Sequence, residues 1–195
     1  EIGGRPILWH ILKIYSQFGF NDFLIAGGYR SEAIKRFFLE YREQMSDLLF
    51  DFTAGTVDRL NTSIEPWRVG VIDTGPESMT GGRIKRLQPH IGNSSFMMTY
   101  GDGVADVDVN ALLAFHRRHG KLATFTAVQR PSQFGVPAFE GDRVIRFAEK
   151  PTNETEWISG GFFVLEPGVM DYIRDDSTNF ELESLKRLAE EGQLM

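Results

Sequence analysis

Cysteine is absent from this chain of 195 residues, which excludes disulfide bonds and zinc sites built on thiolates. Long apolar runs are also missing: none approaches the roughly 18 residues of a membrane span, and no signal peptide is recognisable at the start. Positive charge is in deficit, and the net charge of -6 disfavours binding to nucleic acid or to anionic membranes. An anionic small molecule would therefore need a local basic cluster or a metal ion.

Hydrophobic and aromatic residues are plentiful, at 42% and 12% of the chain, so we expect residues 1–195 to bury one core as a single domain. Stretches with helical spacing of apolar residues alternate with short apolar runs. The sequence predicts helices over residues 5–19, 31–45, 108–120 and 181–191, a turn followed by a short helix within residues 80–91, and strands over residues 23–28, 47–54, 68–75, 94–102, 122–130, 143–151 and 158–167. This alternation predicts an α/β fold in which a mixed, mostly parallel sheet is covered by helices on both faces.

Polar caps and a glycine mark several helix termini. Ser31 and Asp108 are candidate N-caps, and Gly120 is a C-terminal stop. Near that stop, His116 and His119 lie three residues apart on one helix. Such a pair can chelate a metal, but without a third ligand a solvated helix end is the favoured interpretation.

In α/β sheets of this kind, ligands bind beyond the carboxyl ends of the strands. Glycine-rich or polar residues follow several predicted strands, at 27–28, 73–75, 101–103, 149–151 and 159–161. We therefore expect a binding cleft along one rim of the sheet.

The segment "TYGDGVAD" places a carboxylate at that rim. Gly101 and Gly103 flank Asp102 and leave room for a ligand to approach the backbone. Mg²⁺ prefers one or two carboxylates together with phosphate oxygens, so Asp102 is a candidate metal ligand; an ordinary turn aspartate is the alternative. Asp106 and Asp108 form a D-x-D pattern, which many metal-dependent glycosyltransferases use, although Asp108 reads better as a helix cap.

The segment "DTGPESMTGGRIKR" combines glycines with basic residues. Gly81 and Gly82 precede a short helix that carries Arg83, Lys85 and Arg86. Backbone N–H groups of a glycine turn can hold phosphate or read a base edge. The alternative is a glycine turn before a helix whose basic face is solvated.

Two later segments offer contacts for a phosphorylated sugar. In "RFAEKP", Lys150 can pair with a phosphate and Glu149 can accept hydrogen bonds from sugar hydroxyls, although an exposed turn is the alternative. Gly135, and Gly160 with Gly161 in "ISGGFFVLEP", can let a sugar ring lie against the backbone; a bulge or turn is their alternative.

Taken together and in order, five segments resemble the sugar-phosphate nucleotidylyltransferases, and within that family its cytidylyl-transferring branch. They are "EIGGRPILWHILKIYSQFG", "EPWRVGVIDTGPESMTGGRIKR", "FMMTYGDGVADVDV", "RFAEKP" and "ISGGFFVLEP". The resemblance runs over essentially the whole chain. It implies a Rossmann-like nucleotide-diphospho-sugar transferase fold, a cytoplasmic homo-oligomer, and an Mg²⁺-dependent reaction of CTP with glucose 1-phosphate that gives CDP-glucose and pyrophosphate.

The resemblance also implies roles for individual residues. Asp102 and Lys150 would be catalytic, with Asp102 holding Mg²⁺. The nucleotide would contact Thr80, Gly81, Gly82, Arg83 and Gly101, and the sugar phosphate would contact Gly135, Glu149, Lys150, Ser159, Gly160 and Gly161.

Two family segments have no counterpart within residues 1–195: a leading strand with the loop "LAGGxGTRL", and a later "W-x-P-M-D-T" piece whose Asp completes the metal site. We therefore expect a domain truncated at both ends, in which Asp102 is half of a metal site. Two other functions stay open: a non-catalytic sugar-nucleotide-binding homologue that lacks the triphosphate loop by nature, and transfer from another nucleoside triphosphate.

Overall fold

A computed structural model describes residues 1–131, 136–140, 143–148 and 155–195. Its helices are α1 (Ile7–Ser16), α2 (Ser31–Gln44), α3 (Thr80–Ile91), α4 (Val109–His119), the 3₁₀ helix η1 (Pro167–Tyr172), the π-helix η2 (Phe180–Leu185) and α5 (Lys186–Glu190). Its strands are β1 (Asp22–Gly27), β2 (Ser46–Asp51), β3 (Thr56–Thr62), β4 (Arg68–Asp73), β5 (Phe96–Thr99), β6 (Ala123–Pro131), β7 (Val136–Glu140), β8 (Arg143–Ala148) and β9 (Thr155–Leu165). No helix of the described ranges is long and apolar enough to cross a membrane.

The strand pairing confirms a mixed α/β fold but is less parallel than expected. β1 and β4 pair in parallel, with Gly27 opposite Asp73 at their carboxyl ends. β9 lies between β5 and β6 and is antiparallel to both. A connection through α4 could have made β5 and β6 parallel neighbours, but β9 lies between them. Among the described strands, parallel pairing is therefore confined to β1 and β4.

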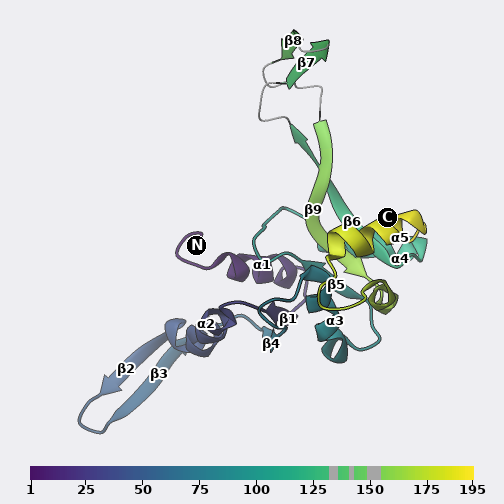
Figure 1. The fold of residues 1–195 in the computed structure, drawn as a ribbon. Helices are drawn as coiled ribbons and strands as arrows, with labels where there is room; N and C mark the ends of the chain where they lie inside the picture. The colour runs from purple at the N-terminus through teal and green to yellow at the C-terminus, as the bar shows by residue number, and fades with distance from the viewer. Residues whose placement is uncertain (132–135, 141–142, 149–154) are drawn as a thin grey trace.

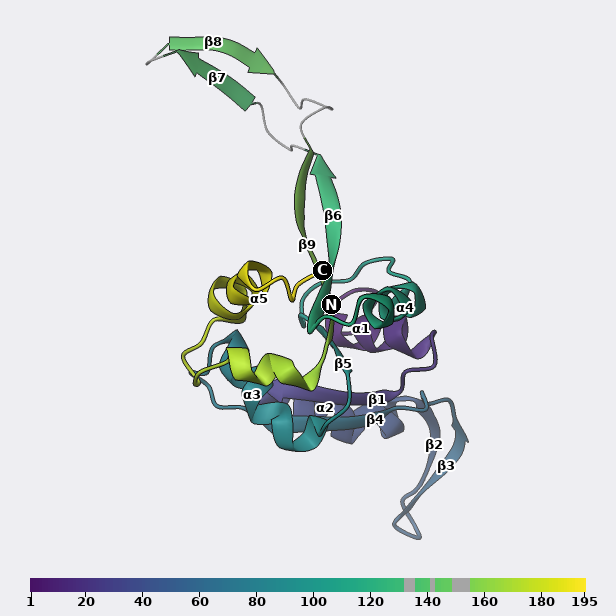
Figure 2. The ribbon, with the colours of Figure 1, turned by 90° about the vertical axis from the view of Figure 1, so that its right-hand side faces the viewer.

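Two ribbons of paired strands extend away from the body, as Figures 1 and 2 show. β2 and β3 form one, and β6 with β9 forms the other. β3 is absent from the sequence-based prediction because all seven of its residues are exposed and none of them carries a core-facing pattern. β7 was missed as well, while β8 lies within a predicted strand.

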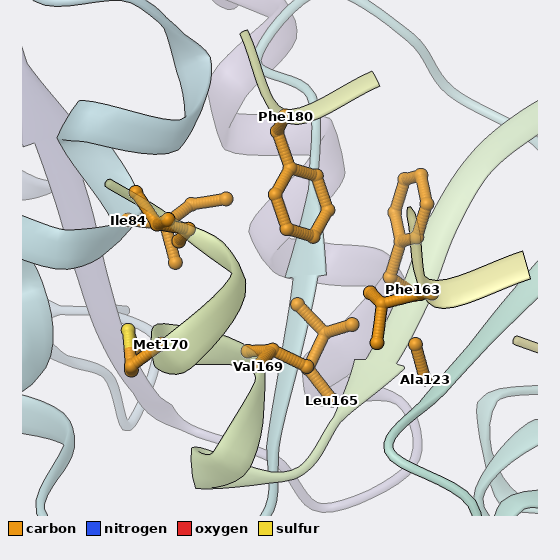
Figure 3. Close-up of a cluster of buried hydrophobic side chains, with 9 residues drawn as sticks. Ile84, Ala123, Phe163, Leu165, Val169, Met170 and Phe180 are labelled. Carbon is orange, nitrogen blue, oxygen red and sulfur yellow. The ribbon is translucent and has the colours of Figure 1, made fainter. Parts of the chain in front are cut away.

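The main hydrophobic core joins β9 to the C-terminal segment, as Figure 3 shows. Phe163, Leu165 and Phe180 are fully buried there, and the Phe163 and Phe180 rings meet edge to face at 6.3 Å. The other buried members are Ile84, Ala123, Val169, Met170, Ile173 and Leu188. Since burying one such side chain contributes about 1.5–3 kcal/mol, this core fixes η1, η2 and α5 against the sheet and against α3.

The helix termini bear out most of the expected signals. The Asp108 carboxylate accepts a hydrogen bond from the Ala111 N–H at 2.9 Å, and Gly120 ends α4 with a φ of 64°. Ser31 is different: it is the first residue of α2, and Arg30, with a φ of 59°, precedes it without a side-chain cap. The prediction of Ser31 as N-cap is therefore wrong, because the tight turn from Gly28 already leads into the helix.

The C-terminal end of α4 is not simply a solvated helix end, because His116 is buried at 2% exposure. A chain of hydrogen bonds starts at the Lys121 N–H, which donates to His119 Nδ1 at 2.9 Å. His119 Nε2 lies 2.7 Å from Thr124 Oγ1, which lies 2.8 Å from His116 Nδ1. His116 Nε2 then lies 3.0 Å from Glu166 Oε1. This chain fastens α4 to the start of β6 and the end of β9.

Candidate functional site

A cavity of about 940 Å³ lies between β1 and β5. Within the described sheets, β1 pairs only with β4, and β5 pairs only with β9, so each has a free edge. Most of the lining is apolar, and it includes side chains of α1 as well as both strands. Thr80, Arg83, Tyr100 and Glu181 bring polar groups to the same cavity. This cavity is therefore the accessible space beside the edge of the sheet where the predicted strand ends lie.

Hydrogen bonds connect the carboxyl ends of β1 and β4 near α3. Thr74 is buried, and both its N–H and its hydroxyl donate to the Gly27 carbonyl at 2.8 Å. The Arg83 guanidinium donates to Thr74 Oγ1 at 2.9 Å and to the Gly75 carbonyl at 3.0 Å. It also lies so close to Gly28 that any Cβ there would overlap it. Arg83 therefore supports two turns of the rim in addition to lining the cavity.

Gly81 and Gly82 lie inside the first turn of α3, where the sequence had predicted a glycine turn before the helix. Both are buried against the segment that precedes η2. A Cβ on Gly81 would meet the Thr178 carbonyl at 2.7 Å, and one on Gly82 would meet the Asp176 Cα at 2.5 Å. The Gly81 N–H already donates to the Thr178 carbonyl at 3.0 Å. Close packing of two backbones therefore accounts for both glycines, and their contact with a nucleotide stays a prediction.

The loop after β5 presents Asp102 to solvent. Gly101, Asp102 and Gly103 are all exposed, and a Cβ added to either glycine would meet nothing within 4 Å. In the described part of the chain, Asp102 has neither a hydrogen-bond nor an ion-pair partner, and no three acidic or histidine side chains gather around a common point. One free carboxylate with open space beside it fits an Mg²⁺ ion held mainly by water and phosphate oxygens.

The second acidic pattern, D-x-D, has a structural explanation. The Asp108 carboxylate is engaged as the N-cap of α4. A capping carboxylate is directed at backbone N–H groups, so it is a poor metal ligand. The alternative based on Asp106 and Asp108 loses its main support.

Sequence reasoning missed a hydrogen-bonded bridge across the cavity. The Thr80 hydroxyl lies 2.7 Å from Glu181 Oε2, and the Tyr100 hydroxyl donates to Glu181 Oε1 at 2.5 Å. The Phe180 N–H donates to Thr80 Oγ1 at 2.9 Å. Burial is the main cause that raises the pKa of the Tyr100 phenol, and the hydrogen bond to Glu181 and the charge of Glu181 raise it further. No local pattern could reveal this bridge, because Glu181 is 101 residues from Thr80 and 81 from Tyr100.

The glycines of β9 lie in an irregular part of its pairing with β6. Gly161 has a φ of 77°, and a Cβ there would meet the Tyr100 ring at 3.0 Å. Gly160 faces Thr126 Oγ1, which a Cβ would meet at 2.6 Å. Ser159 Oγ accepts a hydrogen bond from the Gly161 N–H at 3.2 Å. The bulge expected as the alternative is therefore present, and it adjoins Tyr100 at the end of β5.

Three of the predicted sugar-phosphate contacts, Gly135, Glu149 and Lys150, lie outside the described residues. Among the other predicted site residues, Arg83 lies with the ends of β1 and β4, whereas Gly101 and Asp102 lie with Gly161 near the end of β5. Thr80 is linked to the end of β5 through Glu181.

Known proteins resemble this chain over its full length. Glucose-1-phosphate cytidylyltransferase of Salmonella typhi is 46% identical over 196 residues, which cover 100% of this chain and 76% of the relative. A probable glucose-1-phosphate cytidylyltransferase of Bacillus subtilis is 42% identical over 99% of this chain and 76% of the relative. Mannose-1-phosphate guanylyltransferase catalytic subunit beta of Danio rerio is 30% identical over 100% of this chain and 50% of the relative.

Solved structures show the same fold at low sequence identity. HddC from Yersinia pseudotuberculosis, complexed with GMP-PN, has a TM-score of 0.66 at 19% identity and covers 96% of this chain and 74% of that chain. UDP-glucose pyrophosphorylase complexed with UDP-glucose has a TM-score of 0.61 at 14% identity, over 97% and 77%. These likenesses confirm the nucleotide-diphospho-sugar transferase fold.

The family model for nucleotidyl transferases matches residues 1–195, which is the whole of this chain. Together with the two relatives above 40% identity, this match shows that the chain belongs to the nucleotidyl transferase family.

Proposed function

We propose that this protein transfers the cytidylyl group of CTP to glucose 1-phosphate, giving CDP-glucose and pyrophosphate. The observation that carries the proposal is the identity of 46% and 42%, over 100% and 99% of this chain, to two relatives named for that activity. The geometry agrees with it, since the exposed Asp102 loop and the N-terminal end of α3 are linked beside one cavity.

The reaction needs no separate nucleophile from the protein. A phosphate oxygen of glucose 1-phosphate attacks the α-phosphorus of CTP, a new P–O bond forms, and the bond to the bridging α–β oxygen breaks as pyrophosphate leaves. Catalysis then consists of in-line positioning and charge neutralisation. We assign Asp102 to holding Mg²⁺, which would neutralise phosphate charge when bound. Arg83 and Thr80 border the nucleotide, and Lys150 pairs with the sugar phosphate.

The cavity between β1 and β5 supports a further part of the proposal. Two free strand edges with apolar lining form an acceptor for one more strand. We propose that a strand of the polypeptide outside residues 1–195 lies there and delivers the glycine-rich loop of the family to the rim. The two cytidylyltransferase relatives are longer than this chain, which covers 76% of each. With that strand in place, the triphosphate would lie between Asp102 and Arg83.

Pyrophosphate release by the full-length protein tests the function directly. CTP, UTP, dTTP, GTP and ATP are each supplied with glucose 1-phosphate or another hexose 1-phosphate, with and without Mg²⁺. We expect turnover with CTP and glucose 1-phosphate to exceed every other pair, and to be lost without a divalent ion. Equal turnover of UTP or dTTP would instead support a nucleotidylyltransferase of another specificity, and tight CDP-glucose binding without turnover would support a non-catalytic homologue.

The exposed apolar side chains of the β2–β3 ribbon support a homo-oligomer. Phe50 and Val57 are cross-strand neighbours on one face, and the Phe52 ring stacks on Phe50 at a centroid distance of 6.1 Å. Phe52 is 92% exposed. A two-stranded ribbon is marginally stable alone, so we propose that this face packs on a second copy of the chain.

Because CTP is a cytosolic metabolite, we place this enzyme in the cytoplasm.

A further inference from the structure

We propose that Glu181 is a positioning residue, which sets the Asp102 loop against the N-terminal end of α3 by bridging Tyr100 and Thr80. The inference rests on the proposed function for its catalytic consequence. Its structural part stands on the contacts of the described residues alone.

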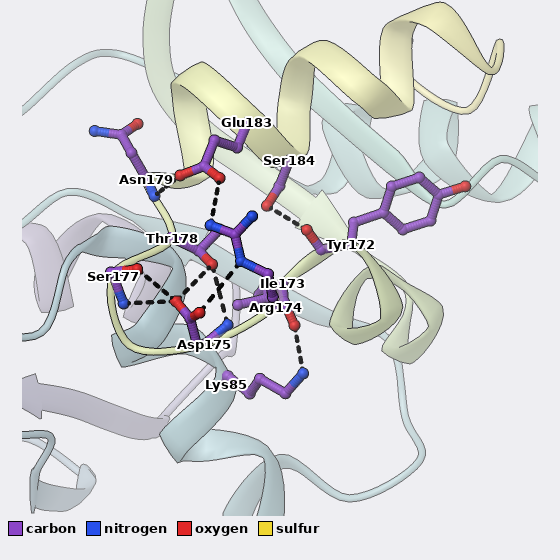
Figure 4. Close-up of polar contacts among 10 residues, drawn as sticks. All are labelled: Lys85, Tyr172, Ile173, Arg174, Asp175, Ser177, Thr178, Asn179, Glu183 and Ser184. Atoms are coloured by element: carbon purple, nitrogen blue, oxygen red, sulfur yellow. Dashed lines mark hydrogen bonds and ion pairs between the residues drawn. The ribbon is translucent and has the colours of Figure 1, made fainter.

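Glu181 is itself held in place by its own segment. Phe180, next to it, is fully buried in the main core. Figure 4 shows the polar contacts that order the preceding turn. Asp175 Oδ1 accepts hydrogen bonds from the Ser177 N–H at 2.9 Å and the Ser177 hydroxyl at 2.6 Å, and Glu183 accepts one from the Asn179 N–H at 2.9 Å. A carboxylate mounted on such a segment can define the position of the groups that bind it.

The direction of each hydrogen bond identifies Glu181 as the acceptor of the bridge. Thr80 Oγ1 accepts the Phe180 N–H, which leaves its hydroxyl proton free to donate to Glu181. Tyr100 donates to the other carboxylate oxygen at 2.5 Å, a length typical of a bond to an ionised acceptor. Among the ion pairs of the described residues, none includes Glu181. Its charge is therefore stabilised by two hydroxyl groups, and losing either would leave a half-buried carboxylate short of a donor.

Tyr100 transmits this position to the loop. It directly precedes Gly101 and Asp102 in the chain. Its ring lies against Gly161 and meets Phe163 edge to face at 5.7 Å, and its hydroxyl donates to Glu181. The hydrogen bond that the Tyr100 hydroxyl donates to Glu181 therefore adds a third contact that holds the residue preceding the loop. Since a displacement of about 1 Å can cost on the order of a hundredfold in rate, the loop position matters for transfer.

Kinetic measurements on full-length variants test the proposal. We expect Glu181→Ala to lower kcat for CTP and glucose 1-phosphate by about tenfold to a hundredfold. Its apparent affinity for Mg²⁺ should fall as well, because Asp102 is no longer set. Glu181→Gln should retain most of the rate, because its amide can accept from Tyr100 and donate to Thr80.

The double variant Tyr100→Phe/Glu181→Ala should be no slower than Glu181→Ala alone within about twofold, since both substitutions break the same bridge. Tyr172→Phe is the matched control: the Tyr172 hydroxyl donates to Glu191 at 2.6 Å with the same chemistry, outside the cavity lining. We expect this control to keep the native rate. The proposal is overturned if Glu181→Gln is as slow as Glu181→Ala, which would mean that the charge acts directly, or if the effects of Tyr100→Phe and Glu181→Ala simply multiply.

Hydrogen exchange separates failure of the bridge from failure of the proposed function. In the absence of any nucleotide, Glu181→Ala should speed amide exchange both in residues 79–82 and in residues 100–103, whereas Tyr172→Phe should leave both unchanged. Unaltered exchange in both segments would refute the bridge whatever the substrate is. Accelerated exchange without CTP turnover by the native protein would refute the cytidylyl transfer and leave the bridge standing.

Discussion

Four of the glycines predicted at the site differ in what surrounds them, and this difference separates packing from ligand contact. Gly81 and Gly82 face backbone within 2.7 Å, Gly161 faces the Tyr100 ring, and Gly101 faces open space. The first three therefore have structural reasons to be glycine. Gly101, beside Asp102, has none in the described contacts, and this agrees with a ligand that approaches the loop.

Substitution of two aspartates separates the nucleotidyl transferase site from the D-x-D alternative. We expect Asp102→Ala to abolish Mg²⁺-dependent turnover while leaving thermal unfolding nearly unchanged, because Asp102 is exposed and unpartnered in the described chain. Asp108→Ala should cost about 1 kcal/mol of stability through loss of the α4 cap, with turnover largely kept. Activity assays and thermal melts of both variants check this, and the opposite ranking would favour the glycosyltransferase interpretation.

Replacing a packed glycine should destabilise the fold more than replacing an open one. In Gly82→Ala the new methyl group would meet the Asp176 backbone, which cannot move aside as a flexible side chain could. Overpacking of this kind typically costs 1–3 kcal/mol. Gly103→Ala, with nothing within 4 Å, is the control and should stay within about 0.5 kcal/mol of the native protein. Urea unfolding measures both, and equal stability of the two variants would contradict the packing explanation.

At the level of elements, the sequence predicted those helices and strands whose ends are determined by residues close to them in the chain. α4 was predicted from its cap to its stop, since Asp108 and Gly120 act within a turn of their own position. β3 was not predicted, because an exposed ribbon needs no buried face and its residues therefore show no alternation of apolar and polar side chains. The prediction of mostly parallel pairing failed because the place of β9 between β5 and β6 is set by the ribbon that brings it back.

The site divides in the same way. Asp102 and its neighbouring glycines follow an apolar strand, so their place at a rim could be read from the sequence. Glu181 could not be found, because its partners are brought to it only by folding of the C-terminal segment onto β9 and α3.

The histidine chain at the end of α4 makes stability depend on pH. Burial is the main cause that lowers the pKa of His119 from its ordinary value of 6.5, and positive charge on His116 when it is protonated, on Lys121 and on Arg118 adds to this effect. The folded protein therefore binds fewer protons than the unfolded chain when the pH lies between the lowered value and 6.5, and stability falls as the pH drops through that window. We expect His119→Gln to reduce the loss of melting temperature between pH 7.5 and 5.

A second titrating group and a control variant bear on that assignment. Burial raises the pKa of Glu166, but the hydrogen bonds from Ser95 and His116 outweigh it, so the net pKa is lowered and its own loss of stability occurs at more acid pH. His90→Gln, at an exposed position of α3, is the control and should melt like the native protein throughout. If His119→Gln and His90→Gln show the same pH profile, the histidine chain is not responsible.

At the scale of the whole molecule, the β2–β3 ribbon extends from the body and exposes the apolar side chains of Phe50, Phe52 and Val57. If a second copy covers it, removing its apolar side chains should weaken assembly without disturbing the core. We expect Phe50→Ser/Phe52→Ser to shift the oligomer toward monomer in light scattering at micromolar concentration. Leu182→Ser, which is 73% exposed on η2, is the control. An unchanged mass for the ribbon variant would exclude this face as the interface.

The hydrogen-bond chain on α4 also fixes which nitrogen of each ring carries a proton. Because the Lys121 N–H donates to His119 Nδ1, the His119 proton is on Nε2 and donates to Thr124. The Thr124 hydroxyl can then donate to His116 Nδ1, and the His116 proton, also on Nε2, donates to Glu166. In this arrangement each ring carries its proton on Nε2, and the hydrogen bonds run in one direction along the chain. Nitrogen-15 spectra should show one tautomer for each ring, because the Lys121 N–H can only donate and the Glu166 carboxylate can only accept, so the other tautomer of either ring would lose a hydrogen bond.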